Sequence, residues 1–327
     1  MKTRIVRLEG GDEAGTVAEA AAVLRRGQLC AFPTETVYGL GADALNAEAV
    51  RAIYAAKGRP AENPLIVHVA DVAGARRMVT DWPAAAEALA ASFWPGPLAV
   101  VLPRASDVPD VTTAGLDTVA VRVPDHAFAR SLIAAAGGAV AAPSANRSEA
   151  VSPTTAAHVK EELDGRVPLV VDGGPTPIGI ESTVVSLLGP PRLLRPGDVS
   201  RAALETVVGP VAVGPASGRP VRSPGQMRRH YAPRATVLLA RAADLPAHAG
   251  DRTGALVHSR GLVASSDGAM GFAAIQRLPA DPRGYARGLY AALRMLDTEV
   301  ERIVIEDVPA DDPAWAAIAD RLHRAGG

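Results

Sequence analysis

Short apolar runs alternate with stretches of helical period through the first two hundred residues. Val17, Ala20, Ala21 and Leu24 share one helical face, and Gly27 can end that helix with a left-handed cap. Further helices are predicted over residues 46–56, 84–92, 128–136 and 152–163. Strands are predicted over residues 29–32, 65–69, 98–102, 119–123, 139–142, 169–171, 183–187 and 193–194. Because some late strands have no helix between them, the pattern predicts an α/β fold with a twisted mixed sheet covered by helices.

A change in composition separates a second, smaller region. Residues 209–235 contain five prolines and four glycines without helical period, which is typical of an extended linker. Beyond them, strands are predicted over 237–239, 255–258, 274–278 and 303–305, with a helix over 313–323 and an apolar helical stripe at Tyr285, Leu289, Leu293, Leu296 and Val300. We therefore expect a catalytic domain over 1–208, a linker over 209–235 and a C-terminal α/β, Rossmann-like domain over 236–327.

Charge and composition exclude several classes of protein. The 34 Lys and Arg residues balance 35 Asp and Glu, so the net charge of −1 argues against a surface that is basic throughout and grips nucleic acid. The single Cys30 excludes an internal disulfide and a cysteine-built zinc site. The chain has no uncharged apolar run near 18 residues, and its N-terminus lacks the apolar core of a signal peptide. These features predict a cytoplasmic protein without a membrane partner.

Four polar loops punctuated by glycine interrupt the first domain. They cover residues 33–44, 57–69, 142–154 and 172–185, each beside a predicted strand, where ligands of open α/β sheets bind. In the first loop, Thr34 and Thr36 offer hydroxyls to a site. Gly39, Gly41 and Ala44 form a G-x-G-x-x-A string, but about six residues separate it from the strand, and the following twenty positions bring the cations Lys57 and Arg59. We reject a dinucleotide fingerprint here.

Two cations lie where a predicted helix, capped by Asn46, ends at Gly58. Lys57 is one of only three lysines, since the other 31 basic residues are arginines, and Arg59 follows it closely. As helix-end cations they would contribute only about 0.3–1 kcal/mol. A lysine point charge beside a bidentate arginine also suits a polyphosphate. Asn63 and His68 follow, and we expect His68 to bind substrate rather than to exchange protons.

Arg122 interrupts the apolar strand 119–123, where a buried guanidinium needs an anion. The sequence leaves two partners open, a ligand carboxylate and a structural salt bridge. In the third loop, Ser144 and Asn146 precede Ser152, which we expect to cap the helix over 152–163 and whose helix start could receive a phosphate.

Oxygen donors for magnesium or an ammonium group gather in the fourth loop. They are Asp172, Glu181, Ser182 and Thr183. No other carboxylate cluster suggests a metal cage, and no Ser/His/Asp arrangement suggests a hydrolase. The sequence therefore predicts no resident metal site.

Taken together, the loop strings resemble the YrdC-like domain of threonylcarbamoyl-AMP synthases. Lys57, Arg59, Ser144 and Asn146 match the family's K-x-R…S-x-N signature. Also similar are PTETVYGLG from 33, NPLIVHV from 63, WPGPL at 94–98, VAVRVP at 119–124, APSAN from 142, IESTVV from 180 and LLRPG at 193–197. This likeness runs from about residue 10 to 200, and SPGQMRRHYAP with the terminal α/β unit resembles the long form of the family.

The resemblance implies a reaction and roles for the site residues. L-threonine, bicarbonate and ATP would give threonylcarbamoyl-AMP and pyrophosphate, with magnesium on the ATP and no tightly bound organic cofactor. The product would pass to a threonylcarbamoyl-transfer complex that acts on tRNA. Threonine would be held by Thr36, His68, Arg122 (on its carboxylate) and Ser182, with backbone near Ala142. ATP would be held by Arg59, Asn63, Thr118, Ser144, Asn146, Ser152 and Arg195, with Lys57 on the phosphates or bicarbonate and His230 and Tyr231 in a linker lid.

Two other functions are compatible with parts of this pattern. Related domains carry a concave basic surface that can hold duplex RNA, although the net charge of −1 and the lack of aromatic stacking clusters weigh against an RNA-binding module. A carbamoyltransferase subunit that uses carbamoyl phosphate is a third possibility within the family; the single cysteine excludes its zinc-finger version.

Overall fold

The computed structural model describes residues 2–8, 12–214, 231–259 and 271–326. The described residues group into two compact units. One comprises residues 2–8, 12–148, 153–177 and 181–214, and the other comprises 149–152, 178–180 and the described residues from 231 onward. The predicted boundaries at 208 and 235 stay a prediction, and most of the predicted linker, residues 215–230, lies outside the described residues.

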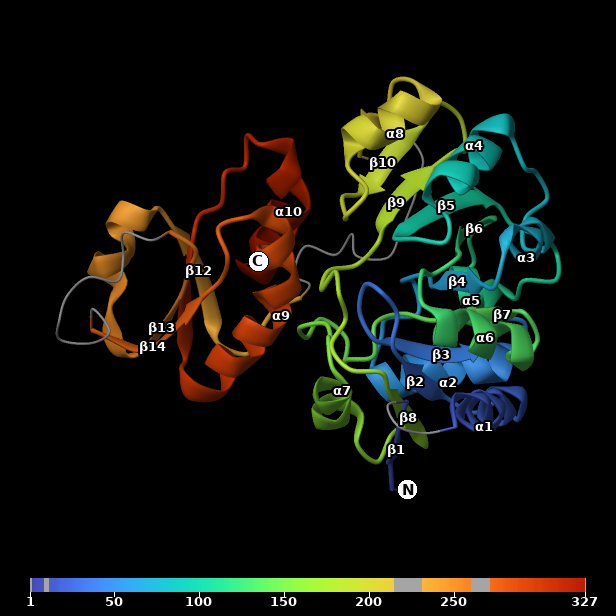
Figure 1. The fold of residues 1–327 in the computed structure, drawn as a ribbon, viewed down its shortest axis with the longest axis horizontal. Coiled ribbons are helices and arrows are strands. Elements are labelled where there is room, and N and C mark those ends of the chain that lie inside the picture. The colour runs from blue at the N-terminus through green and yellow to red at the C-terminus, as the bar shows by residue number, and fades with distance from the viewer. Residues whose placement is uncertain (1, 9–11, 215–230, 260–270, 327) are drawn as a thin grey trace. The chain divides into compact units, whose positions relative to one another are not determined.

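A mixed sheet organises the first unit (Figure 1). Within the described residues its order is β1-β8-β2-β3-β7-β4-β6-β5-β9-β10-β11. The strands are β1 (Arg4–Arg7), β2 (Cys30–Phe32), β3 (Gly39–Asp43), β4 (Ile66–Val69), β5 (Leu98–Pro103), β6 (Thr118–Arg122), β7 (Ala139–Ala141), β8 (Leu169–Asp172), β9 (Thr183–Ser186), β10 (Arg192–Arg195) and β11 (Ala212–Val213). Strand β4 is parallel to β6, whereas β5 is antiparallel to β6 and β3 and β4 are antiparallel to β7. The predicted mixed α/β sheet is confirmed.

Several helices of the first unit begin at a residue whose side chain caps the helix. The helices are α1 (Glu13–Arg25), α2 (Ala47–Lys57), α3 (Val72–Arg77), α4 (Ala84–Phe93), α5 (Asp110–Thr113), α6 (Ala127–Ala136), α7 (Ala156–Leu163) and α8 (Arg201–Val208). Asn46 caps α2 through its side chain, and Gly58 ends α2 at a φ of 61°, a conformation that favours glycine. Helices α1 and α6 pack side by side, as Figure 1 shows.

The N-cap predicted at Ser152 is wrong. Helix α7 is capped by Thr155, whose hydroxyl accepts a hydrogen bond from the backbone N–H of His158. Thr155 offers the same type of side chain only three residues further on, so the sequence could not discriminate between the two caps. The phosphate-binding helix start expected at Ser152 is therefore not present.

The prediction of a loop over residues 33–44 is also partly wrong, because Gly39–Asp43 forms strand β3 in the interior of the sheet. Its two glycines are poor strand formers, which hid it. A Cβ on Gly41 would lie 2.7 Å from Cε1 of Phe32 and 3.0 Å from Cγ1 of Val140, so only glycine lets the strand approach these side chains.

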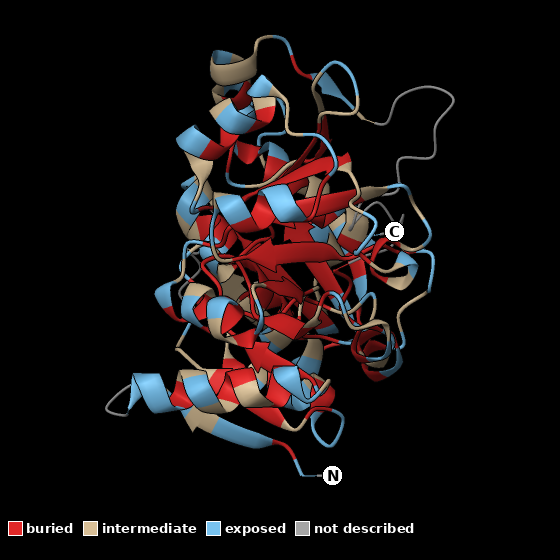
Figure 2. Ribbon diagram, turned by 90° about the vertical axis from the view of Figure 1, so that its right-hand side faces the viewer, coloured by how far each residue is buried: buried red, intermediate tan, exposed pale blue. Residues whose placement is uncertain are grey.

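The two faces of the central strands carry different side chains. The main core includes Val67, Val100, Val119 and Val121. The alternate positions on neighbouring strands form a second, smaller cluster of mostly small residues: Ile66, Ala99, Val101, Ala120, Val184 and Leu194. Figure 2 shows the central strands buried, and the outer turns of the helices and the strand near the N-terminus exposed.

The second unit contains a parallel sheet of order β12-β15-β13-β14 in its described part. Its elements are β12 (Thr236–Ala240), η1 (Ala242–His248), β13 (Gly250–Val257), β14 (Phe272–Arg277), α9 (Pro282–Glu299), β15 (Arg302–Glu306), η2 (Pro313–Trp315) and α10 (Ala316–Gly326). The predicted stripe of α9 is buried against the sheet. The short segment 149–152 belongs here because Glu149 O accepts the backbone N–H of Ala232 and Val151 O accepts the Arg294 guanidinium. No helix in the described ranges has the length and apolar character needed to cross a membrane.

Gly197→Ala tests a backbone approach in the first unit. A Cβ at Gly197 would lie 2.6 Å from the carbonyl carbon of Ser182 and 2.7 Å from the carbonyl oxygen of Glu181, and would also meet Thr183 N. Because backbone cannot move aside as a side chain can, we expect the variant to lose about 1–3 kcal/mol of unfolding free energy in thermal or urea unfolding.

Gly250→Ala is the matched control. A Cβ there would lie 3.5 Å from Thr253 Oγ1, an ordinary contact, so the melting temperature should change little. Equal melting temperatures for the two variants would contradict the close approach at Gly197.

Candidate active site

Arg122 is the centre of a group of polar side chains at one end of the sheet. It lies at the carboxyl end of β6 and is only 3% exposed. Its Nη2 donates to Thr36 Oγ1 at 3.0 Å, and its Nε donates to the carbonyl of Gly96 at 3.2 Å. Thr36 Oγ1 lies 2.9 Å from Thr34 Oγ1, which donates to Val37 O. These contacts join the β2–β3 loop to β6.

Of the two partners that the sequence left open for Arg122, the structure contains the internal one. Glu35 Oε1 lies 2.7 Å from Arg122 Nη2, and both side chains are nearly fully buried. The contact is an ion pair, but neither Glu35 oxygen accepts a hydrogen bond of regular geometry among the described residues. Glu35 was missed by the sequence analysis, although its place between Thr34 and Thr36 and the unpaired charge of Arg122 could have indicated it. The ligand carboxylate stays a prediction.

His68 is the neighbour of Arg122 across the sheet. The parallel pairing of β4 with β6 sets His68 opposite Arg122. Burial, together with the positive charges of Arg122 and Arg195, lowers the pKa of His68 to about 3, although one backbone hydrogen bond raises it. Nδ1 of the ring has no hydrogen-bond partner among the described residues. A histidine that stays neutral near pH 7 is suited to binding rather than to proton exchange.

Ser182 and Arg195 form a second contact at the same end. Arg195 Nε donates to the Ser182 carbonyl at 3.0 Å, and Arg195 Nη2 donates to Ser182 Oγ at 3.1 Å. Both residues are buried. The charge of Arg195 is near enough to lower the pKa of His68, so this pair belongs with the Arg122 group.

Lys57 contacts the third loop. Its ammonium donates to the carbonyl oxygens of Ser144, at 2.6 Å, and of Asn146. Lys57 is only 2% exposed, and burial lowers the pKa of Lys57 well below its ordinary value, with the charge of Arg59 lowering it further and Glu162 raising it. Two of the three N–H donors thus hold loop backbone.

Arg59, Asn63 and Thr118 lie toward the other end of these strands. Arg59 Nε donates to Asn63 O at 3.1 Å, and its Nη2 donates to Pro64 O at 3.0 Å. Thr118 begins β6, two residues before Ala120, the partner of Ile66, so it lies at the Pro64 end of β4. Arg122 lies four positions after Thr118, which corresponds to about 13 Å of extended strand.

The backbone of residues 142–146 connects the two groups. Ala142 N donates to Ile66 O at 3.1 Å, and Ala145 N donates to Tyr38 O at 2.8 Å. Gly39 and Ser144 form a bridge, so this segment contacts both β4 and the start of β3. Between the polar groups lies the small apolar cluster of Ile66, Ala99, Val101, Ala120, Val184 and Leu194.

The remaining predicted residues lie elsewhere or outside the description. Ser152 is buried and belongs to the second unit, as does Tyr231. Tyr231 stacks on Tyr290 with ring centroids 5.8 Å apart. His230 lies outside the described residues. Asp172 accepts the backbone N–H of Gly174 at 3.0 Å, so its carboxylate stabilises a turn at the end of β8.

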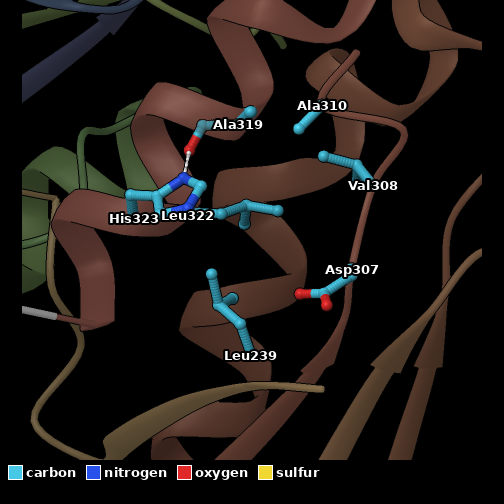
Figure 3. A pocket seen from close by; sticks show the side chains of 7 residues that line it. All are labelled: Leu239, Asp307, Val308, Ala310, Ala319, Leu322 and His323. Carbon is cyan, nitrogen blue, oxygen red and sulfur yellow. Dashed lines mark hydrogen bonds between the residues drawn. The ribbon is translucent and has the colours of Figure 1, made fainter. Parts of the chain in front are cut away.

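A small cavity of about 170 Å³ lies in the second unit (Figure 3). Leu239, Leu322, Asp307 and His323 line it, with His323 Nδ1 donating to Ala319 O at 2.7 Å. None of the predicted site residues lines this cavity. In the described part of the chain, no group of three or more His, Cys, Asp or Glu is arranged to hold a metal ion.

Comparison with known proteins relates both parts of the chain to one kind of enzyme. Residues 22–197 match the family described as "Telomere recombination", and residues 199–327 match "Threonylcarbamoyl-AMP synthase, C-terminal domain". Threonylcarbamoyl-AMP synthase of Bacillus subtilis (strain 168) is 43% identical, over 100% of this chain and 99% of that protein. The synthase of Pyrococcus abyssi is 40% identical, over 99% and 98%. The crystal structure of P. abyssi Sua5 complexed with L-threonine superposes with a TM-score of 0.88 at 41% identity, over 99% of this chain and 98% of that one.

The pKa of His68 leads to a pH test. Because the folded-state pKa is about 3 and the ordinary value is 6.5, the unfolded chain binds a proton that the folded chain does not bind as the pH falls from about 6.5 toward 3. His68 should therefore contribute a loss of unfolding free energy of about 1.4 kcal/mol per pH unit in that window, and nothing above it.

His68→Gln supplies the reference for this measurement, since all other titrating groups cancel in the comparison. Unfolding of both proteins at pH 7 and pH 5 should show the wild type losing more stability than the variant. Parallel losses would mean that His68 is protonated in the folded protein as readily as in the unfolded chain.

Proposed function

The chain belongs to the threonylcarbamoyl-AMP synthase family, and we propose that it joins L-threonine, bicarbonate and ATP into threonylcarbamoyl-AMP and pyrophosphate. The enzyme is then a nucleotidyltransferase whose product serves tRNA threonylcarbamoyladenosine modification. The observation that carries the proposal is the convergence of Thr36, His68 and Arg122 in one buried polar group, in a chain alike over its whole length to two such synthases.

In the proposed complex, threonine binds at the Arg122 end of the sheet. Arg122 Nη1 has no hydrogen bond among the described residues, so its donors are available to a carboxylate. Thr36 and Ser182 offer hydroxyls beside it, and neutral His68 offers a ring nitrogen. The solved P. abyssi protein that the chain resembles carries L-threonine, which supports this assignment.

ATP binds, in this proposal, across the same sheet face toward Arg59, Asn63 and Thr118. Arg59 and Arg195 supply guanidinium donors for phosphate oxygens, and the third N–H of Lys57 is directed to the phosphates or bicarbonate. Ser144, Asn146 and Ser152 complete the set that the family resemblance implies. Thr118 and Arg122 lie about 13 Å apart along β6, so in this proposal the two ends of the site contact different substrates.

The proposed reaction needs no covalent bond between the protein and its substrates. The threonine amine becomes a carbamate, and a carbamate oxygen then attacks the α-phosphorus of ATP while pyrophosphate leaves. Positioning the two reactants and stabilising the phosphate charge are the main contributions. We propose that magnesium arrives as the complex with ATP, since phosphate oxygens are its usual partners in such reactions.

Two further parts of the proposal concern the surroundings of the reaction. The product is proposed to pass to a threonylcarbamoyl-transfer complex acting on tRNA, and the reaction to take place in the cytoplasm. The lid role that the family resemblance implies for His230 and Tyr231 stays a prediction, and His230 lies outside the described residues.

Substrate dependence tests the reaction itself. The protein, ATP, magnesium and labelled bicarbonate should release pyrophosphate and form a labelled adenylate only when L-threonine is added. A coupled pyrophosphate assay with chromatography of the label measures both. Pyrophosphate release at the same rate without threonine would overturn the proposed function.

Arg59→Ala tests the nucleotide end of the site. Loss of charge-assisted hydrogen bonds to phosphate should lower kcat/KM for ATP by about 10–100-fold, with a much smaller effect on threonine dependence. Arg51→Ala is the control, because Arg51 lies on helix α2, is exposed and pairs with Glu48. If the two variants were equally active, Arg59 would be only a helix-end cation.

A further inference from the structure

Glu35 is in direct contact with Arg122, and it has no part in the proposed function so far. It is 5% exposed, and both of its oxygens are buried without a hydrogen bond of regular geometry. An ion pair with Arg122 Nη2 satisfies part of its charge. Burying carboxylate oxygens that accept no hydrogen bond costs free energy. A further hydrogen-bond donor beside Glu35 would therefore be stabilising.

A free amino acid brings two charges into this place. Its carboxylate is suited to the available Nη1 donors of Arg122, but its α-ammonium, two bonds away, also needs an acceptor. The hydroxyl of Thr36, which accepts from Arg122, carries no negative charge and so cannot balance an ammonium. Arg195 is positively charged, so it would repel an ammonium rather than bind it. Glu35 is the group whose charge and free lone pairs match an ammonium.

We propose that Glu35 binds the α-ammonium of the amino-acid substrate while Arg122 binds its carboxylate. The buried Arg122–Glu35 pair has no net charge, and neither does the zwitterionic amino acid. Binding therefore adds no net charge to a site that is shielded from water. Opposite charges held side by side then select α-amino acids over hydroxy acids of the same shape. This inference rests on the proposed function, because it assigns the threonine end of that site.

The test compares two ligands on the wild type and on Glu35→Gln. L-threonine and 3-hydroxybutyrate share a carboxylate, a β-hydroxyl and a methyl group, but 3-hydroxybutyrate has no amine. By calorimetry or competition binding, the wild type should prefer threonine by at least about 10-fold, the value of a charge-assisted hydrogen bond. In Glu35→Gln, threonine affinity should fall by about 10–100-fold, while 3-hydroxybutyrate affinity should change much less.

Two results would overturn the inference. A parallel loss for both ligands would mean that Glu35 only orients Arg122. Equal affinity of the wild type for the two ligands would exclude an ammonium site, whether or not the variant folds. Glu35→Asp, which keeps the charge, should retain part of the preference for threonine, and a melting curve of each variant checks that it is folded.

Threonine-dependent release of pyrophosphate by the wild type is measured separately. If that activity is present and the ligand preference is absent, the proposed function stands and the role of Glu35 fails. If no threonine-dependent activity is found while the preference persists, the chain binds amino acids for another reaction.

Discussion

A charged side chain inside a sheet needs an opposite charge or a hydrogen bond, and this requirement organises the site. Arg122 lies in an apolar strand between valines, and it is stabilised there by Glu35, Thr36 and the carbonyl of Gly96. These three partners come from two different loops. The buried guanidinium therefore fixes the β2–β3 loop and the segment before β5 against β6.

Lys57 meets the same requirement with backbone instead of a carboxylate. By holding the carbonyls of Ser144 and Asn146 it shapes the third loop, and a second contact runs back from Ser148 N to Lys57 O at 2.9 Å. Lys57 thus fixes the loop with two of its N–H donors and keeps a third, which is suited to a site that binds and releases phosphates. The lowered pKa of Lys57 is the cost of holding this charge away from water.

The sheet itself explains why distant segments can share one ligand. Alternate residues of β4 and β6 point to the same face, so His68 and Arg122 stand beside each other while Ile66 and Ala120 form an apolar floor between them and the Thr118 end. The small side chains of Ala99 and Ala120 extend only a short way from the strands on this face. Because the sheet is mixed, short connections such as the β2–β3 loop can join antiparallel strands and reach this surface. Parallel strands would need longer crossover connections.

The sequence by itself determined the α/β class, the mixed sheet, the stripe of α9 and most of the polar residues that gather at the site. Those properties are local, because periodicity, caps and short motifs are written in neighbouring residues. It missed β3, whose glycines disguise a strand, and it set the cap of α7 at Ser152 instead of Thr155. Only the tertiary structure decided that Glu35 pairs with Arg122 and that Lys57 holds the carbonyls of residues 144 and 146. Such contacts join residues more than eighty positions apart, and no spacing along the chain encodes them.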